Sequence, residues 1–272
     1  MPFRRLLVSD EGSKKMLFQV AYHSNIGSTK KVNQDAVGFK EIEFQGRHFA
    51  MLIVCDGMGG LQDGEKASAT VVRSLLDWFE KEFPAKDSNF DYSILQRELE
   101  IKIVKCNAAL HKYGVENGIQ LGTTLSTLLI RDDGSYLIAN VGDSRIYMGN
   151  RENVIQITED QTYIEREIKS NRMTLEEARE SRMKNVLTQC IGVNEAVEVL
   201  FYRGKAVSNE FFLACSDGFR HFMTEIDLYN SLYSVIDEND EGKWTALLEQ
   251  ITSDNMNKGE KDNITSAIVK IQ

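Results

Sequence analysis

The sequence predicts an α+β fold with mainly antiparallel sheets, and two features of the chain lead to this prediction. Segments typical of strands come in blocks, whereas segments with helical periodicity come in pairs. The chain has 272 residues, of which 42% are apolar and 27% are charged, close to the averages for soluble globular proteins. A chain of this length and composition can form a large domain with a substantial hydrophobic core.

The N-terminal half begins with three predicted strands at about 17–22, 36–44 and 48–55. Residues 49–55 form a continuous apolar run, which is typical of a strand buried on both faces. Two long helices are predicted next, because apolar residues recur about every four positions and form one stripe on each helix. The stripes contain Ala67, Val71, Leu75, Phe79 and Phe83, and then Leu95, Leu99, Ile103, Cys106 and Leu110.

The C-terminal half returns to strands between 123 and 157, with turns predicted at 132–134 and 149–150. Residues 158–185 are charged and poor in large apolar side chains, so we interpret them as a surface insertion. Strands follow at about 197–203 and 211–215, then helices at about 224–236 and 243–256 and a last strand at 264–271. We expect residues 1–15 to form a short leader and residues 16–272 to form one domain.

The net charge of −9 argues against a nucleic-acid partner, which would need a basic face, but allows the binding of hard cations. The four cysteines lack metal-binding spacing, and we expect them to be reduced and mostly buried in a cytoplasmic protein; they are Cys55, Cys106, Cys190 and Cys215. No apolar run approaches the ~18 residues of a membrane span, so we expect no membrane segment.

Acidic residues stand at the ends of the most apolar predicted strands. Asp56, Asp143 and Asp217 each follow such a strand, and Asp262 comes just before the last one. A single Asp-Gly pair is usually part of a turn, but buried strands bring their ends together on one rim of a sheet. Clustered carboxylates raise one another's pKa unless a cation neutralises them, and Mg²⁺ and Mn²⁺ prefer oxygen ligands. The residues alone therefore support a metal centre, in which two ions ~3.5–4 Å apart could activate a bridging water and bind a phosphoryl group.

Other chemistries lack the residues that they require. Residues 57–60 before a helix imitate a dinucleotide-binding turn, but Gln62 stands where the third glycine is needed. A cysteine phosphatase needs an arginine where His221 follows Cys215, and the other cysteines fail the same test. The histidines form no zinc-type pair, and neither a P-loop nor a Gly-x-Ser-x-Gly motif occurs.

Several short motifs point together to one family. They are NQDA at 33–36, VCDGMGG at 54–60, GExAS at 64–68, GTTL at 122–125, VGDSRxY at 141–147, NVLTQ at 185–189 with IG at 191–192, CSDG at 215–218 and DNIT at 262–265. In this order they resemble the metal-dependent protein phosphatases of the 2C type, in their compact bacterial form. The resemblance covers about residues 25–271.

The resemblance implies a four-layer αββα sandwich, in which two mainly antiparallel sheets are flanked by helix pairs and 158–185 is a mobile flap beside the site. It also implies hydrolysis of phosphoserine and phosphothreonine esters on proteins. A hydroxide that bridges two Mn²⁺ or Mg²⁺ ions attacks phosphorus in this family, and no phospho-enzyme forms. The implied partners are phosphorylated proteins, including a Ser/Thr kinase, and we expect a cytoplasmic monomer.

By motif position, the resemblance assigns a metal-binding role to six residues. Asp56 bridges two ions, Asp217 and Asp262 hold the first, and Asp35 with the Gly57 carbonyl serves the second, largely through waters. Asp143, together with Asp217, resembles the acids that hold a weaker third ion. Asn263 is expected to support Asp262.

The chain departs from the family pattern at three positions. Lys30 replaces the usual phosphate-binding arginine, so we expect it to bind phosphate without a bidentate fork, and adjacent Lys31 could share this role. Met58 replaces a histidine of some members and cannot donate a proton, which leaves a metal-bound water as the expected donor. Gln161 replaces a frequent flap histidine.

The sequence leaves two alternative functions open. One is a catalytically silent, phosphatase-like module that binds a kinase; the retained acids argue against it, and Lys30 is the only feature in its favour. The other keeps metal-dependent hydrolysis but acts on a small phosphoester.

Overall fold

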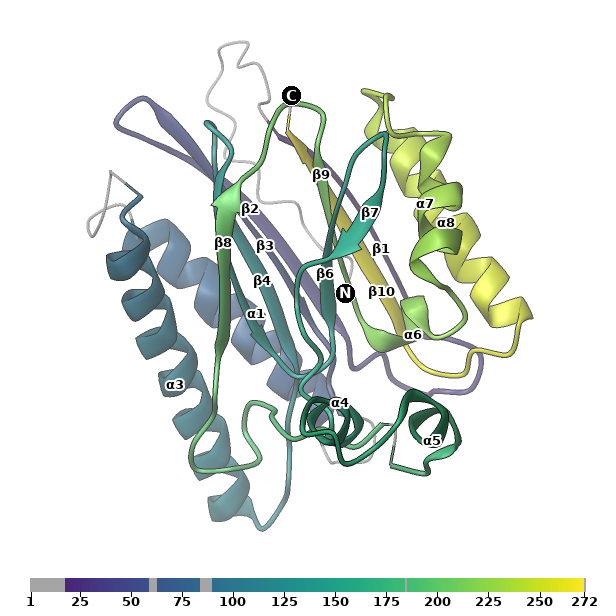
Figure 1. Ribbon diagram of the computed structural model, residues 1–272. Helices are drawn as coiled ribbons and strands as arrows, with labels where there is room; N and C mark the ends of the chain where they lie inside the picture. Colours follow the sequence, from purple (N-terminus) through teal and green to yellow (C-terminus); the bar gives the residue numbers. More distant parts are fainter. Residues whose placement is uncertain (1–17, 59–62, 84–89, 184, 272) are drawn as a thin grey trace.

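A computed structural model describes residues 18–58, 63–83, 90–183 and 185–271; the predicted leader lies outside these ranges. Two five-stranded sheets pack face to face, with helices on both outer faces (Figure 1). In spatial order, one sheet contains β1 (Phe18–Asn25), β10 (Ile264–Ile271), β9 (Phe211–Cys215), β6 (Arg145–Gly149) and β7 (Val154–Gln156). The other contains β2 (Ala36–Phe44), β3 (Arg47–Cys55), β4 (Leu125–Arg131), β5 (Ser135–Val141) and β8 (Leu200–Lys205). All neighbouring strands in both sheets are antiparallel, which confirms the predicted α+β sandwich.

Strand β3 lies at the centre of the packing, as its continuous apolar run predicts. Its alternate side chains Ala50, Leu52 and Val54 face the other sheet and join the core between the two sheets. The intervening residues, such as Met51 and Ile53, pack beneath the helices on the outer face. Because a strand points successive side chains to opposite faces, both faces of β3 must be apolar.

Each sheet carries one pair of long helices. Helices α1 (Gly64–Lys81) and α3 (Tyr92–Asn117) cover the sheet that contains β3. Helices α7 (Glu225–Tyr233) and α8 (Glu241–Asn257) cover the other sheet, where the Trp244 side chain is fully buried. The N-termini of α3 and α7 are capped by side chains of Asp91 and Thr224, which accept hydrogen bonds from backbone N–H groups of the first turn.

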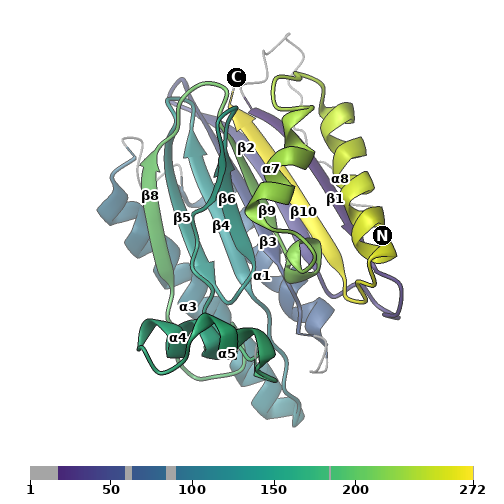
Figure 2. The ribbon, with the colours of Figure 1, turned by 45° about the vertical axis from the view of Figure 1, so that its right-hand side comes forward.

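Short helices gather at one end of the sandwich. The predicted insertion at 158–185 contains α4 (Tyr163–Lys169) and α5 (Leu175–Glu180), which lie below the sheets in Figures 1 and 2. Helix α6 (Asp217–Arg220), which the sequence did not predict, lies at the same end (Figure 1).

One strand boundary differs from its prediction for a clear reason. Strand β8 begins at Leu200, not at 197, because side chains occupy the backbone groups of Glu198. The amide of Glu198 donates to Gln189 Oε1 at 3.1 Å, and its carbonyl accepts from Gln161 Nε2 at 3.2 Å. These groups are therefore not available to the sheet.

All four cysteines are buried free thiols. Within the described ranges, no helix is both long and apolar enough to cross a membrane.

Candidate metal centre

The sheet register brings the predicted acids to one end of the sandwich. Cys55 pairs with Ala36, so Asp56 after β3 and Asp35 before β2 are neighbours at the same rim. In the other sheet, Cys215 pairs with both Ser266 and Arg145. Segments that flank these residues carry Asp217, Asp262 and Asp143, which explains how acids far apart in sequence meet.

Hydroxyl groups join the two sheets at this rim. Ser216 Oγ donates to Asp35 Oδ2 at 2.9 Å, which connects the end of β9 to the start of β2. The Thr124 Oγ1 accepts from the Asp56 amide at 2.9 Å and lies 2.6 Å from Ser144 Oγ. The backbone that carries Asp56 is therefore fixed before any ion binds.

Gly57 stands where no side chain would fit. A Cβ atom at this position would lie 2.4 Å from the Gly64 carbonyl oxygen and 2.5 Å from that of Gln34. The Gly57 amide donates to the same Gln34 oxygen at 3.1 Å. This close approach holds 56–57 against the loop that carries Asp35.

The carboxyl groups resist ionisation in the absence of a cation. Burial, together with the charges of Asp217 and Asp262, raises the pKa of Asp35 to about 7, although hydrogen bonds from Thr265 and Ser216 act in the opposite direction. Burial and the neighbouring acids, Asp35 first among them, raise the pKa of Asp56 well above its usual value. Burial and the charge of Asp217 raise the pKa of Asp143 to about 6. The rim therefore favours any group that brings positive charge to it.

Asp217 differs because it has a cationic partner. Its burial favours the neutral acid, but the hydrogen bond and charge of His221 outweigh this effect and lower the pKa of Asp217. His221 Nε2 lies 3.2 Å from Asp217 Oδ2, and His221 Nδ1 lies 2.8 Å from Glu260 Oε2. The hydrogen bond to Asp217 is the largest cause that raises the pKa of His221, to about 9.

Lys30 contacts an acid of the centre. Its Nζ lies 2.6 Å from Asp262 Oδ1. Burial opposes the charge on Lys30, but the hydrogen bond and charge of Asp262 exceed this effect and raise the pKa of Lys30. The predicted phosphate-binding role of Lys30 stays a prediction, and its ammonium group lies at the same rim as the acids.

Asn263 forms hydrogen bonds with the neighbouring loops, and its predicted role of supporting Asp262 stays a prediction. Its Nδ2 donates to the carbonyls of Ile26 and Val32, and its Oδ1 accepts from the Gln34 amide at 2.9 Å. Its own amide donates to Asp262 Oδ1 at 2.8 Å. Asn263 thus links the loop of Asp35 to that of Asp262.

The donor set fits divalent ions at the centre of the cluster. Asp35 Oδ1 and Asp217 Oδ1 are buried, and neither accepts a hydrogen bond within the described structure. Bare carboxylate oxygens of this kind suit Mg²⁺ or Mn²⁺. In the described ranges, no three His, Cys, Asp or Glu side chains are placed to hold one ion by themselves. Ions here would therefore also need backbone carbonyls and waters, which Mg²⁺ readily keeps.

The base of the flap is connected to the centre by Gln161, Arg145 and Arg220, for which no such contacts were predicted. Gln161 exchanges hydrogen bonds with the backbone of Gly142, which directly precedes Asp143. Arg145 binds the Asp160 carboxylate through two bonds of 2.8 and 2.7 Å. Arg220 contacts both Asp160 and Asp143.

In a helix that starts at Asp217, positions 220 and 221 lie on the same side as Asp217. This spacing is the sequence signal that could have found Arg220 and His221.

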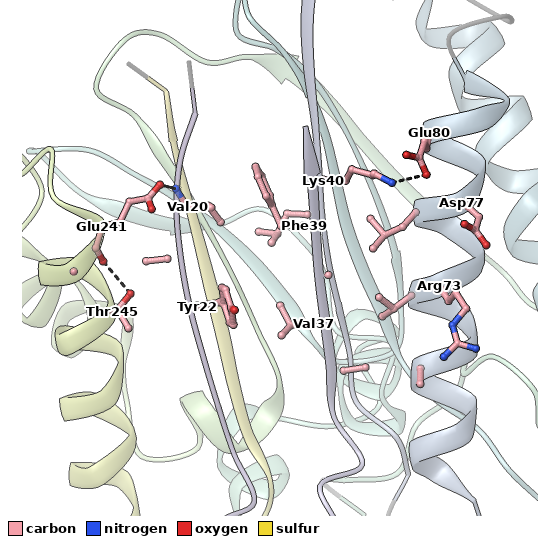
Figure 3. Close-up of a pocket in the computed structure, with 18 residues that line it drawn as sticks. Val20, Tyr22, Val37, Phe39, Lys40, Arg73, Asp77, Glu80, Glu241 and Thr245 are labelled. Atoms are coloured by element: carbon pink, nitrogen blue, oxygen red, sulfur yellow. Dashed lines mark hydrogen bonds and ion pairs between the residues drawn. The ribbon is translucent and has the colours of Figure 1, made fainter. Parts of the chain in front are cut away.

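A separate cavity of about 530 Å³ opens at the edge of the sandwich, between α1, α8 and the edge strands β1 and β2 (Figure 3). Its walls include Val37 and Phe39, and an ion pair between Lys40 and Glu80 lies on its α1 side. None of the predicted site residues lines it, so the acid cluster and not this cavity is the candidate active centre.

The fold and the acid rim together define a class of protein, an αββα sandwich with a cluster of buried acids that suits divalent metal ions. Residues 24–262 match the family model of protein phosphatase 2C, and the chain belongs to this family. Membership implies dependence on divalent metals, and it confirms the family that the motifs predicted.

The similar proteins are bacterial phosphatases. Protein phosphatase PhpP of Streptococcus pneumoniae is 28% identical over 255 residues, which cover 93% of this chain and 97% of PhpP. Serine/threonine phosphatase stp of Listeria welshimeri is 31% identical over 184 residues, which cover 68% of this chain and 72% of stp. The crystal structure of serine/threonine phosphatase Stp1 from Staphylococcus aureus superposes with a TM-score of 0.80 at 26% identity, covering 98% of this chain and 100% of that one. These relatives support the phosphatase interpretation and not the silent binding module.

The raised pKa values predict how pH affects the metal-free protein. Asp35 and Asp143 have folded pKa values of about 7 and about 6, compared with about 3.9 for an unfolded aspartate. Their contribution to stability is therefore complete below about pH 4 and is lost as the pH rises through 6 and 7. We expect urea unfolding in EDTA to show a loss of about 2 kcal/mol from Asp35 between about pH 5 and 7.

The Asp35→Asn substitution should remove the contribution of Asp35. The free energy of unfolding should then fall less between about pH 5 and 7. His221 also loses its contribution to stability as the pH rises, but mainly above about pH 7, because its folded pKa is about 9. If the free energy of unfolding fell equally with pH in the native protein and the variant, Asp35 would not be protonated on folding.

Proposed function

We propose that this protein is a Mn²⁺- or Mg²⁺-dependent phosphatase that hydrolyses phosphoserine and phosphothreonine esters on proteins. The observation that carries the proposal is the convergence of acids from both sheets at one rim, with the buried oxygens of Asp35 and Asp217 left bare. Family membership and the similar serine/threonine phosphatases support the same conclusion.

In this proposal, the acids hold two ions in distinct ways. Asp56 would bind both ions, Asp217 and Asp262 would hold one, and Asp35 with the Gly57 carbonyl would serve the other. When bound, the ions would lower the pKa of a water so that hydroxide is available to attack phosphorus, and they would offset the negative charge of the phosphoryl oxygens. Asn263 keeps the loops of Asp35 and Asp262 in register through its four hydrogen bonds.

Lys30 supplies the positive charge that meets the substrate phosphate. Its side chain is 28% exposed and lies 2.6 Å from Asp262, so it can reach solvent from beside a metal ligand. Bound ions would compete with the ammonium group for Asp262 and release it toward the substrate. A lysine contributes a point charge and no bidentate fork, so the contact should lower KM more than it raises kcat.

We further propose that the substrates include a Ser/Thr kinase and that the enzyme works as a cytoplasmic monomer. The four buried free thiols suit a reducing compartment. The acidic chain needs no basic surface for this role, because the metal ions supply the positive charge that attracts phosphate.

Turnover of a phosphothreonine peptide should require Mn²⁺ or Mg²⁺, and Asp217→Asn should lower kcat by about a hundredfold or more. The substitution removes one of the negative charges that would hold the ions. Asp254→Asn, on the exposed face of α8, is a matched control that should leave turnover unchanged. A native protein without metal-dependent turnover would contradict the function, and an active Asp217→Asn variant would contradict the site.

Lys30→Ala should raise KM for the phosphopeptide about tenfold, in the range of one charge-assisted hydrogen bond, with a smaller effect on kcat. Lys30→Arg should restore the native KM or lower it further, because a guanidinium binds phosphate through two donors. Lys31→Ala tests whether the adjacent Lys31 also contributes to phosphate binding. An unchanged KM in Lys30→Ala would show that Lys30 does not bind the phosphate.

A further inference from the structure

Arg220 stands beside the acid to which the family resemblance assigns a third metal ion. Its Nη2 donates to the Asp143 carbonyl at 3.0 Å and lies 3.4 Å from Asp143 Oδ2. The inference drawn from this contact rests on the proposed function, since it concerns the number of ions in the same centre.

Both the backbone and the side chain of Arg220 are held in this position. Arg220 is the last residue of α6, which begins at Asp217, so its backbone is tied to the centre. Its side chain is only 15% exposed and also lies 3.4 Å from Asp160 Oδ2. Asp160 is in turn fixed by the two hydrogen bonds from Arg145. The guanidinium thus sits between two acids, one from the centre and one from the base of the flap.

A guanidinium in this place conflicts with a divalent ion on the same carboxylate. Arginine stays protonated at any pH at which the protein folds, so its charge cannot be withdrawn. An ion bound to Asp143 would have to displace Arg220 or share Asp143 with a positive charge a few ångströms away. Asp35 and Asp217 each keep a buried oxygen without a hydrogen-bond partner, whereas the Asp143 carboxylate has the Arg220 guanidinium 3.4 Å from its Oδ2.

We propose that Arg220 takes the place of the third divalent ion, so that the centre binds two ions. Arg220 then acts as a positioning residue: it fixes the Asp143 carboxylate and joins it, through Asp160, to the base of the flap. The two-ion site and the flap are connected by protein charge and not by a labile metal.

Equilibrium dialysis of the purified chain against increasing Mn²⁺ tests this proposal without any activity measurement. We expect two ions per native chain. Arg220→Gln should gain a third, weaker ion, and the double variant Arg220→Gln/Asp143→Asn should return to two. Arg220→Lys keeps the charge and should also bind two. Arg203→Gln, on β8 and away from the rim, is the control for loss of an arginine.

Three ions on the native chain, with the third lost in Asp143→Asn, would overturn the proposal, and so would an Arg220→Gln variant that still binds two. Anomalous diffraction from native crystals grown with Mn²⁺ does not depend on the folding of any variant: two Mn²⁺ peaks are expected, and a peak in contact with Asp143 would contradict the proposal. A native chain that binds no Mn²⁺ would overturn the proposed function as well, whereas three ions on an active phosphatase would overturn this inference alone.

Discussion

Repulsion among buried carboxylates is the constraint on which the rest of this structure depends. Five acids from two sheets meet at one rim, where burial and mutual charge raise the pKa values of Asp35, Asp56 and Asp143. Such a cluster destabilises the fold unless positive charge reaches it. The sandwich tolerates the cluster because its cores lie elsewhere, between the sheets and beneath the helices.

Positive charge reaches the rim from the protein at its edges and, in our proposal, from metal ions at its centre. Lys30, Arg220 and His221 each contact one acid of the rim, at Asp262, Asp143 and Asp217 respectively. Asp35 Oδ1 and Asp217 Oδ1 are left buried without a hydrogen-bond partner, and in our proposal these oxygens receive the metal ions. The acid excess of the chain is therefore compatible with a phosphate substrate, because attraction is local and does not require a basic surface.

Much of the fold and the acid set could be predicted from the sequence because their signals are local. The apolar run of β3 predicts a strand buried on both faces, and an acid directly after such a strand predicts its place on the rim. Arg220 and His221 lie at helical spacing from Asp217, but their contacts with Asp143 and Glu260 form only through tertiary packing, so these contacts could not be predicted from a local pattern. The start of β8 was misplaced because two glutamine side chains bind the backbone of Glu198, and no local pattern reports such bonds.

We infer that the buried acids take up protons when metal is absent and give them up when ions bind. Isothermal titration of Mn²⁺ at about pH 6.5, in two buffers with different ionisation enthalpies, counts the protons released on binding. We expect about one proton or more per chain, and a smaller number for Asp35→Asn, because burial raises the pKa of Asp35 to about 7 in the metal-free protein. Binding of Mn²⁺ without proton release, unchanged in Asp35→Asn, would contradict the claim.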